Sequence, residues 1–167
     1  MPRRVNRSQI SHAYAIAHAG ELGKCVLYLN TDSGAGHVEG WRVEGRTDSQ
    51  AALVPIAKQL LAPLGGGKVD PAFDPGSDQV SFLAEGVPAI DLAVDETIYP
   101  TIIHRPGDTI DKVDAHALAT GVAVIAVTAY AIASGPDRLP RLDRKAMEAI
   151  FKASDFDAVM RFEGWWK

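Results

Sequence analysis

The chain has 167 residues, of which 47% are hydrophobic and 23% charged, and its net charge is −4 at pH 7. This composition is typical of a globular domain with a substantial core, and it gives no electrostatic basis for nucleic-acid binding. We see no run of about 18 apolar residues that would span a membrane and no apolar segment after Arg4 that would mark a signal peptide. We therefore expect a soluble protein with no membrane partner, and its compartment stays unknown.

The apolar residues recur with the spacing of helices and strands in turn. In chain order, the pattern predicts a helix over 9–22, a strand over 24–30, a strand over 40–45, a helix over 51–64, a short strand over 68–73, a helix over 79–85, a strand over 87–94, a long loop over 95–111, a helix over 113–134 and one or two helices over 142–160. Ser11 and Asp48 are predicted helix caps. The helix over 113–134 is apolar on nearly all faces, which predicts burial against a sheet.

This alternation predicts an α/β fold with a mainly parallel sheet flanked by helices. We divide the chain into an α/β domain over residues 1–136 and a helical tail over 137–167 that packs on it, because Pro136 and Pro140 bracket a short linker. Cys25 is the single cysteine, so no intrachain disulfide forms. It lies in an apolar run, where a buried structural thiol is expected.

Three polar loops follow predicted strands or precede helices, over residues 30–37, 74–78 and 95–109. Ligand sites in parallel α/β sheets form at the carboxyl ends of strands, so these loops are the candidate site. Asp32 can reach a metal ion from such a loop, although an Asp in Asp-Ser-Gly also makes ordinary turns. His104 can be a zinc ligand supported by Asp108 and Thr109, or a loop histidine beside a capped turn.

Ser77 is a weaker candidate for a catalytic nucleophile. It lacks the Gly-x-Ser-x-Gly pattern that exposes a nucleophilic serine on a tight turn. A Ser or Asp in front of a helix, such as Ser77 and Asp78, is usually a cap.

Several motifs occur together in a recognisable order. They are Ser11–Leu22, Leu29–Gly36, Gly76–Asp78, Gly86–Ala89, His104–Asp114 and Leu139–Arg144. In this order they resemble M28 zinc peptidases, and among them the plasma glutamate carboxypeptidase-like branch. The resemblance covers the chain from about residue 10 onward, and it implies part of a phosphorylase/hydrolase-like zinc exopeptidase fold.

The resemblance also implies roles for individual residues. Asp32 matches a carboxylate ligand of one zinc ion and His104 the histidine ligand of the other. Asp108 and Thr109 match the partners behind that histidine. A further group matches the loops that border the substrate: Ser77, Asp78 and Tyr99. The implied reaction is aminopeptidase or carboxypeptidase hydrolysis of a terminal peptide bond by a zinc-bound water, with a peptide or a small amide or ester as substrate.

The sequence departs from the family pattern at the general base. The Glu-Glu pair that supplies the base and an acidic ligand would fall near Arg4 and Val5, and the first histidine and the bridging carboxylate have no counterpart. Inside the matched part, Gln79 stands where a histidine is frequent, and Arg105 where a small hydroxyl residue is frequent. We therefore expect a partial catalytic domain.

Three hypotheses follow. The chain is part of an M28-type metallopeptidase, or a non-catalytic protein that acts by binding or assembly, or a hydrolase with a site rebuilt around Ser77, Asp78 and His104. Without the upstream strands of the family, a sheet edge and apolar helix faces would be exposed, which predicts a homo-oligomer, most simply a two-fold dimer.

Overall fold

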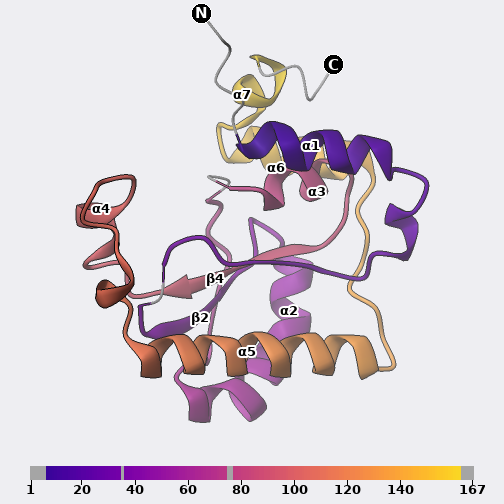
Figure 1. Ribbon diagram of the computed structural model, residues 1–167. Coiled ribbons are helices and arrows are strands. Elements are labelled where there is room, and N and C mark those ends of the chain that lie inside the picture. The colour runs from indigo at the N-terminus through magenta and orange to yellow at the C-terminus, as the bar shows by residue number, and fades with distance from the viewer. Residues whose placement is uncertain (1–6, 35, 75–76, 163–167) are drawn as a thin grey trace, which may run out of the picture.

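The computed structural model describes residues 7–34, 36–74 and 77–162, and a four-stranded sheet lies at its centre (Figure 1). The strands are β1 (Tyr28–Asn30), β2 (Val38–Arg42), β3 (Lys68–Asp70) and β4 (Ala89–Val94), in the order β1-β4-β2-β3. β1 pairs with β4 in parallel, as β2 does with β3, whereas β2 and β4 are antiparallel. The predicted α/β class is confirmed, but the antiparallel pairing at the centre of the sheet was not foreseen.

Helices cover both faces of this sheet, as Figure 1 shows. They are α1 (Arg7–Ala17), α2 (Thr47–Ile56), α3 (Gln79–Ala84), α4 (Tyr99–Ile102), α5 (Ala115–Ser134), α6 (Arg144–Ala153) and α7 (Asp157–Phe162). α5 and the segment after α2 pack on one face, and α3 packs on the other, where it contacts α1 and α6. The result is a three-layer domain.

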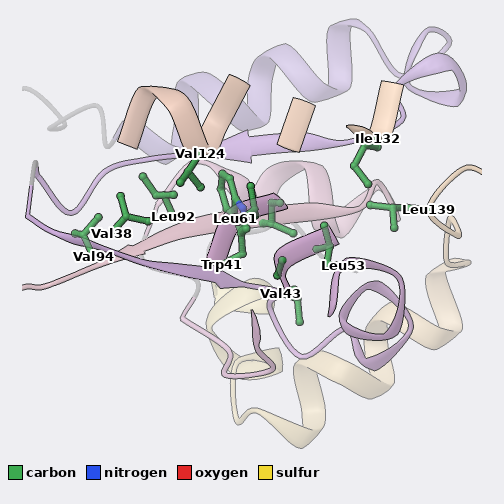
Figure 2. Packing of buried hydrophobic residues seen from close by; sticks show 12 residues of the cluster. Val38, Trp41, Val43, Leu53, Leu61, Leu92, Val94, Val124, Ile132 and Leu139 are labelled. Atoms are coloured by element: carbon green, nitrogen blue, oxygen red, sulfur yellow. The ribbon is translucent and has the colours of Figure 1, made fainter. Parts of the chain in front are cut away.

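The main core lies between the sheet and α5 (Figure 2). Trp41 of β2 is completely buried, and its indole Nε1 donates a hydrogen bond of 3.0 Å to Thr128 Oγ1 of α5. Val38 and Leu92 pack beside it from the sheet, and Val124 faces them from α5. The bond to Thr128 satisfies the polar atom of a large side chain that otherwise contributes only apolar contact.

Three local predictions were wrong in ways the structure explains. Asp48 is not the cap of α2, because the helix begins one residue earlier at Thr47 and the Asp48 carboxylate accepts hydrogen bonds from Arg46. Ser11 lies inside α1, where its hydroxyl is 3.0 Å from that of Ser81. β1 begins only at Tyr28, because a short 3₁₀ turn over Leu22–Lys24 precedes it.

The predicted packing of α5 against the sheet is confirmed, although only part of the helix surface is buried. Leu118, Val122 and Tyr130 are exposed, and Tyr130 shows 75% of its surface. By length and composition alone, this 20-residue helix is long and apolar enough to cross a membrane, since an 18-residue stretch of it has a mean hydropathy of 1.9; no such segment was expected from the sequence. A core helix of a globular domain meets the same criterion, and α5 packs on β2 with a buried face that includes Gly121 and Val124.

The tail after residue 136 is joined to the rest of the protein by buried contacts. Met147 and Phe151 of α6 and Met160 of α7 share a core cluster with Leu83 of α3. The completely buried Arg46 donates hydrogen bonds to Asp48 and to the backbone oxygen of Pro140, so it connects the start of α2 to the linker. The division at residue 136 stays a prediction.

We expect Arg46→Ala to lower the free energy of unfolding by about 3 kcal/mol, because it removes a buried cation that bridges two chain segments. Chemical denaturation measures this loss. The control is Arg138→Ala, since Arg138 is an exposed arginine in the same linker. Equal stability losses in the two variants would contradict the bridging role of Arg46.

Candidate functional site

A cavity of about 490 Å³ opens beyond the carboxyl ends of β1 and β4. The loop after β1 forms one wall, the segment from Asp95 to Asp108 another, and the start of α5 the third. Four residues predicted from the sequence line this one cavity, namely Asp32, Tyr99, His104 and Asp108. The expectation that the functional loops meet at the carboxyl ends of strands therefore agrees with the structure for two of the three loops.

Tyr99 joins the two loops that carry Asp32 and His104. Its hydroxyl donates a hydrogen bond of 3.0 Å to the backbone oxygen of Asp32. Its ring lies against Gly34, where an added Cβ would be 3.0 Å from Tyr99 Cδ2. At Gly36 an added Cβ would be 2.0 Å from the backbone oxygen of Asp95, so only glycine allows this approach. The two loops are thus packed directly on each other.

His104 adopts an unusual backbone conformation, with a φ of 58°. It follows α4, a single turn whose last backbone hydrogen bond runs from Ile103 N to Tyr99 O at 3.0 Å. A non-glycine residue in this left-handed region costs of order 1 kcal/mol, and such residues cluster at functional sites. Thr109 is not among the residues that line the cavity, and its hydroxyl donates to Asp111 Oδ1.

Ser77 and Asp78 lie at the start of α3 and are not among the residues that line the cavity. Asp78 occupies the N-cap position of α3, but its side chain makes no cap hydrogen bond. Its charge acts instead on Tyr28, whose pKa is raised by burial, by Asp78 and by Asp32. The structure therefore does not bring Ser77 and His104 to one cavity wall. Pro75 and Gly76 lie outside the described residues.

The described residues do not fit a complete zinc site. Asp32 and His104 line the same cavity, yet no group of three or more His, Cys, Asp or Glu side chains among residues 7–34, 36–74 and 77–162 is placed to hold a metal ion. A stable protein zinc site takes about three or four protein ligands. The position predicted for the Glu-Glu pair, near Arg4 and Val5, lies outside the described residues.

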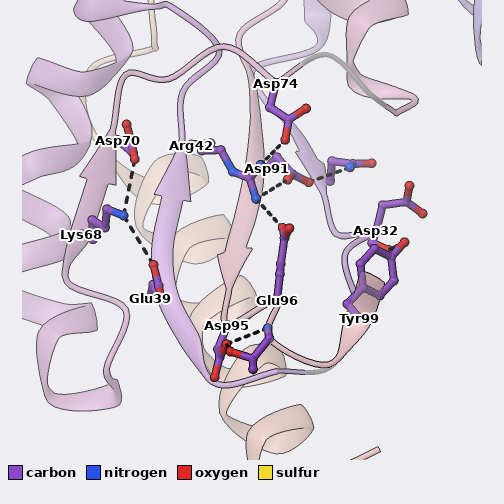
Figure 3. A network of polar contacts seen from close by, with 12 residues as sticks. Asp32, Glu39, Arg42, Lys68, Asp70, Asp74, Asp91, Asp95, Glu96 and Tyr99 are labelled. Atoms are coloured by element: carbon purple, nitrogen blue, oxygen red, sulfur yellow. Dashed lines mark hydrogen bonds and ion pairs between the residues drawn. The ribbon is translucent and has the colours of Figure 1, made fainter. Parts of the chain in front are cut away.

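Sequence reasoning missed a polar network that centres on Arg42 (Figure 3). Asp91, in the middle of β4, is only 4% exposed. Its Oδ1 accepts a 2.7 Å hydrogen bond from Asn30 Nδ2, and its Oδ2 lies 3.7 Å from Arg42 Nη2. Burial raises the pKa of Asp91 to about 6 although both partners oppose the shift. The signal was visible in the sequence, because Asp91 is a charged residue inside an apolar strand.

Glu44 is a second buried carboxyl that the sequence did not reveal. It has a φ of 50° and no exposed surface. Its carboxyl group accepts hydrogen bonds from the Asp74 backbone N–H at 2.8 Å and from Gln79 Nε2 at 3.3 Å. Burial raises its pKa to about 7. Gln79 is thus a buried partner of Glu44, while its own Oε1 finds no hydrogen-bond partner in the described part of the chain.

Comparison with known proteins gives a consistent result. Residues 9–129 match the family described as Peptidase family M28. Carboxypeptidase Q of Mus musculus is 31% identical over 128 residues, which are 77% of this chain and 27% of the relative, and that of Rattus norvegicus gives the same values. Carboxypeptidase Q of Bos taurus is 28% identical over 131 residues. This chain therefore spans about a quarter of the length of the curated relatives that it matches.

A solved structure is also similar. The crystal structure of a Peptidase M28 precursor from Shewanella amazonensis SB2B superposes with a TM-score of 0.71 at 30% sequence identity. The match covers 81% of this chain and 30% of that chain. The arrangement of sheet and helices is thus that of one portion of a larger peptidase.

We predict that Glu44 makes the fold less stable as the pH rises. Because its pKa is about 7 in the folded protein and ordinarily 4.5, the folded state holds the proton more tightly, so stability falls between these two values and is then constant. Glu44→Gln should abolish this loss and be more stable than the parent by up to about 3 kcal/mol near pH 8.

Denaturant unfolding at about pH 5 and about pH 8 measures this effect, since the two values bracket the Glu44 titration. Glu39→Gln is the matched control, because Glu39 is an exposed glutamate of β2. An advantage of Glu44→Gln that does not grow with pH would refute the assignment.

Proposed function

The chain belongs to peptidase family M28, and we propose that it carries one part of the active site of an exopeptidase that hydrolyses terminal peptide bonds. The observation behind this proposal is the single cavity that Asp32, Tyr99, His104 and Asp108 line together. The first and last of these residues, Asp32 and Asp108, lie 76 positions apart in the sequence, and the family resemblance gives the four residues related roles. A peptide, or a small amide or ester, is the proposed substrate class.

We further propose that this chain alone does not turn over peptides. Asp32 and His104 are the positions that the resemblance assigns to two different zinc ions, so each ion would keep a single protein ligand from this chain. The general base has no counterpart among the described residues. The proposed contribution of the chain is therefore the cavity wall, the two ligand positions, and the loop contacts that hold them. The remaining groups must come from other residues or from another chain.

A non-catalytic role is the second candidate function. It is favoured by one observation, the absence of any three-ligand metal group among the described residues. In that case the cavity would bind a ligand without hydrolysing it. The esterase alternative around Ser77, Asp78 and His104 has no comparable support, because only His104 lines the cavity.

A chimera tests the proposal. In it, this chain replaces the matched portion of the Shewanella peptidase, whose remaining sequence supplies the groups that are missing here. We expect zinc-dependent release of terminal residues from short peptides, and loss of at least about 100-fold in Asp32→Ala and His104→Ala chimeras, because metal ligands orient and activate the attacking water. His116→Ala is the control, since His116 is exposed on α5 and does not line the cavity.

The outcomes separate the hypotheses. A folded chimera that binds substrate without hydrolysing it would support the non-catalytic role and contradict the peptidase proposal. Zinc-independent ester hydrolysis by the chain itself, lost in Ser77→Ala, would support the esterase alternative.

The exposed sheet edge leads to a proposal on assembly. Within the described residues β1 pairs only with β4 and forms an outer edge of the sheet. Tyr28 N donates to Pro88 O at 2.8 Å, so the next backbone N–H along the strand, that of Leu29, points away from β4. Unpaired strand edges favour pairing with another chain. We propose that a second copy covers this edge in a two-fold dimer.

Sedimentation should then show a dimer whose population rises with protein concentration. Hydrogen exchange adds a local measurement, because dimerisation through the β1 edge should slow exchange of the Leu29 amide as the concentration rises. The Tyr28 amide is the internal control, since it is already bonded to Pro88. A monomer at all concentrations would contradict the proposed dimer, as would an exchange rate of the Leu29 amide that does not depend on protein concentration.

A further inference from the structure

Arg42 is the cation at the centre of the polar network that includes Asp91 (Figure 3). Its side chain is 15% exposed and contacts carboxylates from three separate segments. Nη1 pairs with Asp74, which follows β3, and Nη2 pairs with Glu96 at 2.9 Å. Nη2 also lies 3.7 Å from Asp91 in the middle of β4. One guanidinium therefore holds the centre of the sheet to two loops.

Two of these contacts, those with Asp91 and Glu96, connect Arg42 to the loops that carry cavity-lining residues. Asp91 accepts the Asn30 side-chain hydrogen bond, and Asn30 ends β1 two residues before Asp32. Glu96 follows Asp95, whose carboxylate accepts the Thr97 backbone N–H at 2.9 Å and so shapes the turn that leads to Tyr99. The loop after β1 is thus linked to Arg42 through Asp91 and Asn30, and the segment that carries Tyr99 is linked to it through Glu96.

The charges explain why this link matters. Asp74, Asp91 and Glu96 surround one guanidinium, and the Asp32 carboxylate is close enough to raise the pKa of Asp91. Without the cation, three carboxylates would repel one another around a buried strand. Asp91 cannot move, because it lies inside β4. Glu96 is 39% exposed and can move, so relief would come from displacement of the loop that carries Tyr99.

We propose that Arg42 is a positioning residue of the cavity, which keeps the loop of Tyr99 and His104 packed against the loop of Asp32. A role of Arg42 in catalysis rests on the proposed function, but the packing of the two loops on each other can be measured without metal or substrate. Lys68 on the neighbouring strand β3 offers the natural comparison. It also bridges two carboxylates, Glu39 and Asp70, yet these contacts are largely exposed, and neither partner lies in a loop that carries cavity-lining residues, whereas Glu96 lies between Asp95 and Ile98, which line the cavity.

The test uses the Tyr99 ring as a reporter in solution NMR spectra of the full chain. Because Gly34 lies against this ring, its α-proton and amide resonances carry a ring-current shift that Tyr99→Leu removes. We expect Arg42→Gln to lose most of that shift, Arg42→Lys to keep part of it, and Lys68→Gln to keep all of it. Glu96→Ala should lose part of the shift, since it removes the contact nearest to the loop.

Two results would overturn the proposal. One is a folded Arg42→Gln protein with the parental Gly34 shift. The other is a parental Gly34 shift in Glu96→Ala. This second variant keeps the test decisive if Arg42→Gln does not fold, because Glu96 is partly exposed and its replacement should leave the fold intact. An inactive chimera would count against the proposed peptidase function and would leave this NMR result unaffected.

Discussion

The central position of β4 is the constraint on which the rest of the structure depends. This strand is buried along its whole length and pairs with β1 on one side and β2 on the other. Its register places Asp91 opposite both Asn30 and Arg42. A buried carboxylate needs hydrogen bonds or a cation, and these two neighbours provide them. The same register brings the carboxyl ends of β1 and β4 together, which puts Asp32 near the segment that carries Tyr99 and His104.

Much of this arrangement could be predicted from the sequence because it follows from local patterns. The apolar runs around Leu29 and Leu92 predicted two buried strands of a mainly parallel sheet, and the polar residues after each run predicted the candidate site. The antiparallel pairing of β2 with β4 could not be predicted, since the local sequence of a strand and its loops does not specify which other strand it pairs with. The exposure of α5 was also missed, because its apolar composition does not indicate how much of its surface the sheet covers.

The residues of the candidate site and its surroundings also differ in whether the sequence could predict them. Asp32 and His104 could be identified because short motifs surround them. Arg42 and Glu44 could not, since each acts through partners more than 25 residues away, at Asp91 and Glu96 for one and at Asp74 and Gln79 for the other. The sequence signal for Glu44 is weak because buried and exposed glutamates look alike in a short polar stretch. Long-range pairing, and not residue type, decides their role.

The contacts that shape the cavity differ from the groups that would perform chemistry in it. Tyr99 bonds to the backbone oxygen of Asp32, so that contact leaves both carboxylate oxygens of Asp32 for a ligand. The approach of Gly36 to Asp95 is likewise a backbone contact, and Arg42 and its carboxylate partners are not among the residues that line the cavity. These contacts can therefore keep the shape of the cavity without using the carboxylate of Asp32. For this protein, family membership accounts for the fold, whereas the described residues bring no group of three or more His, Cys, Asp or Glu side chains together at the cavity in a position to hold a metal ion.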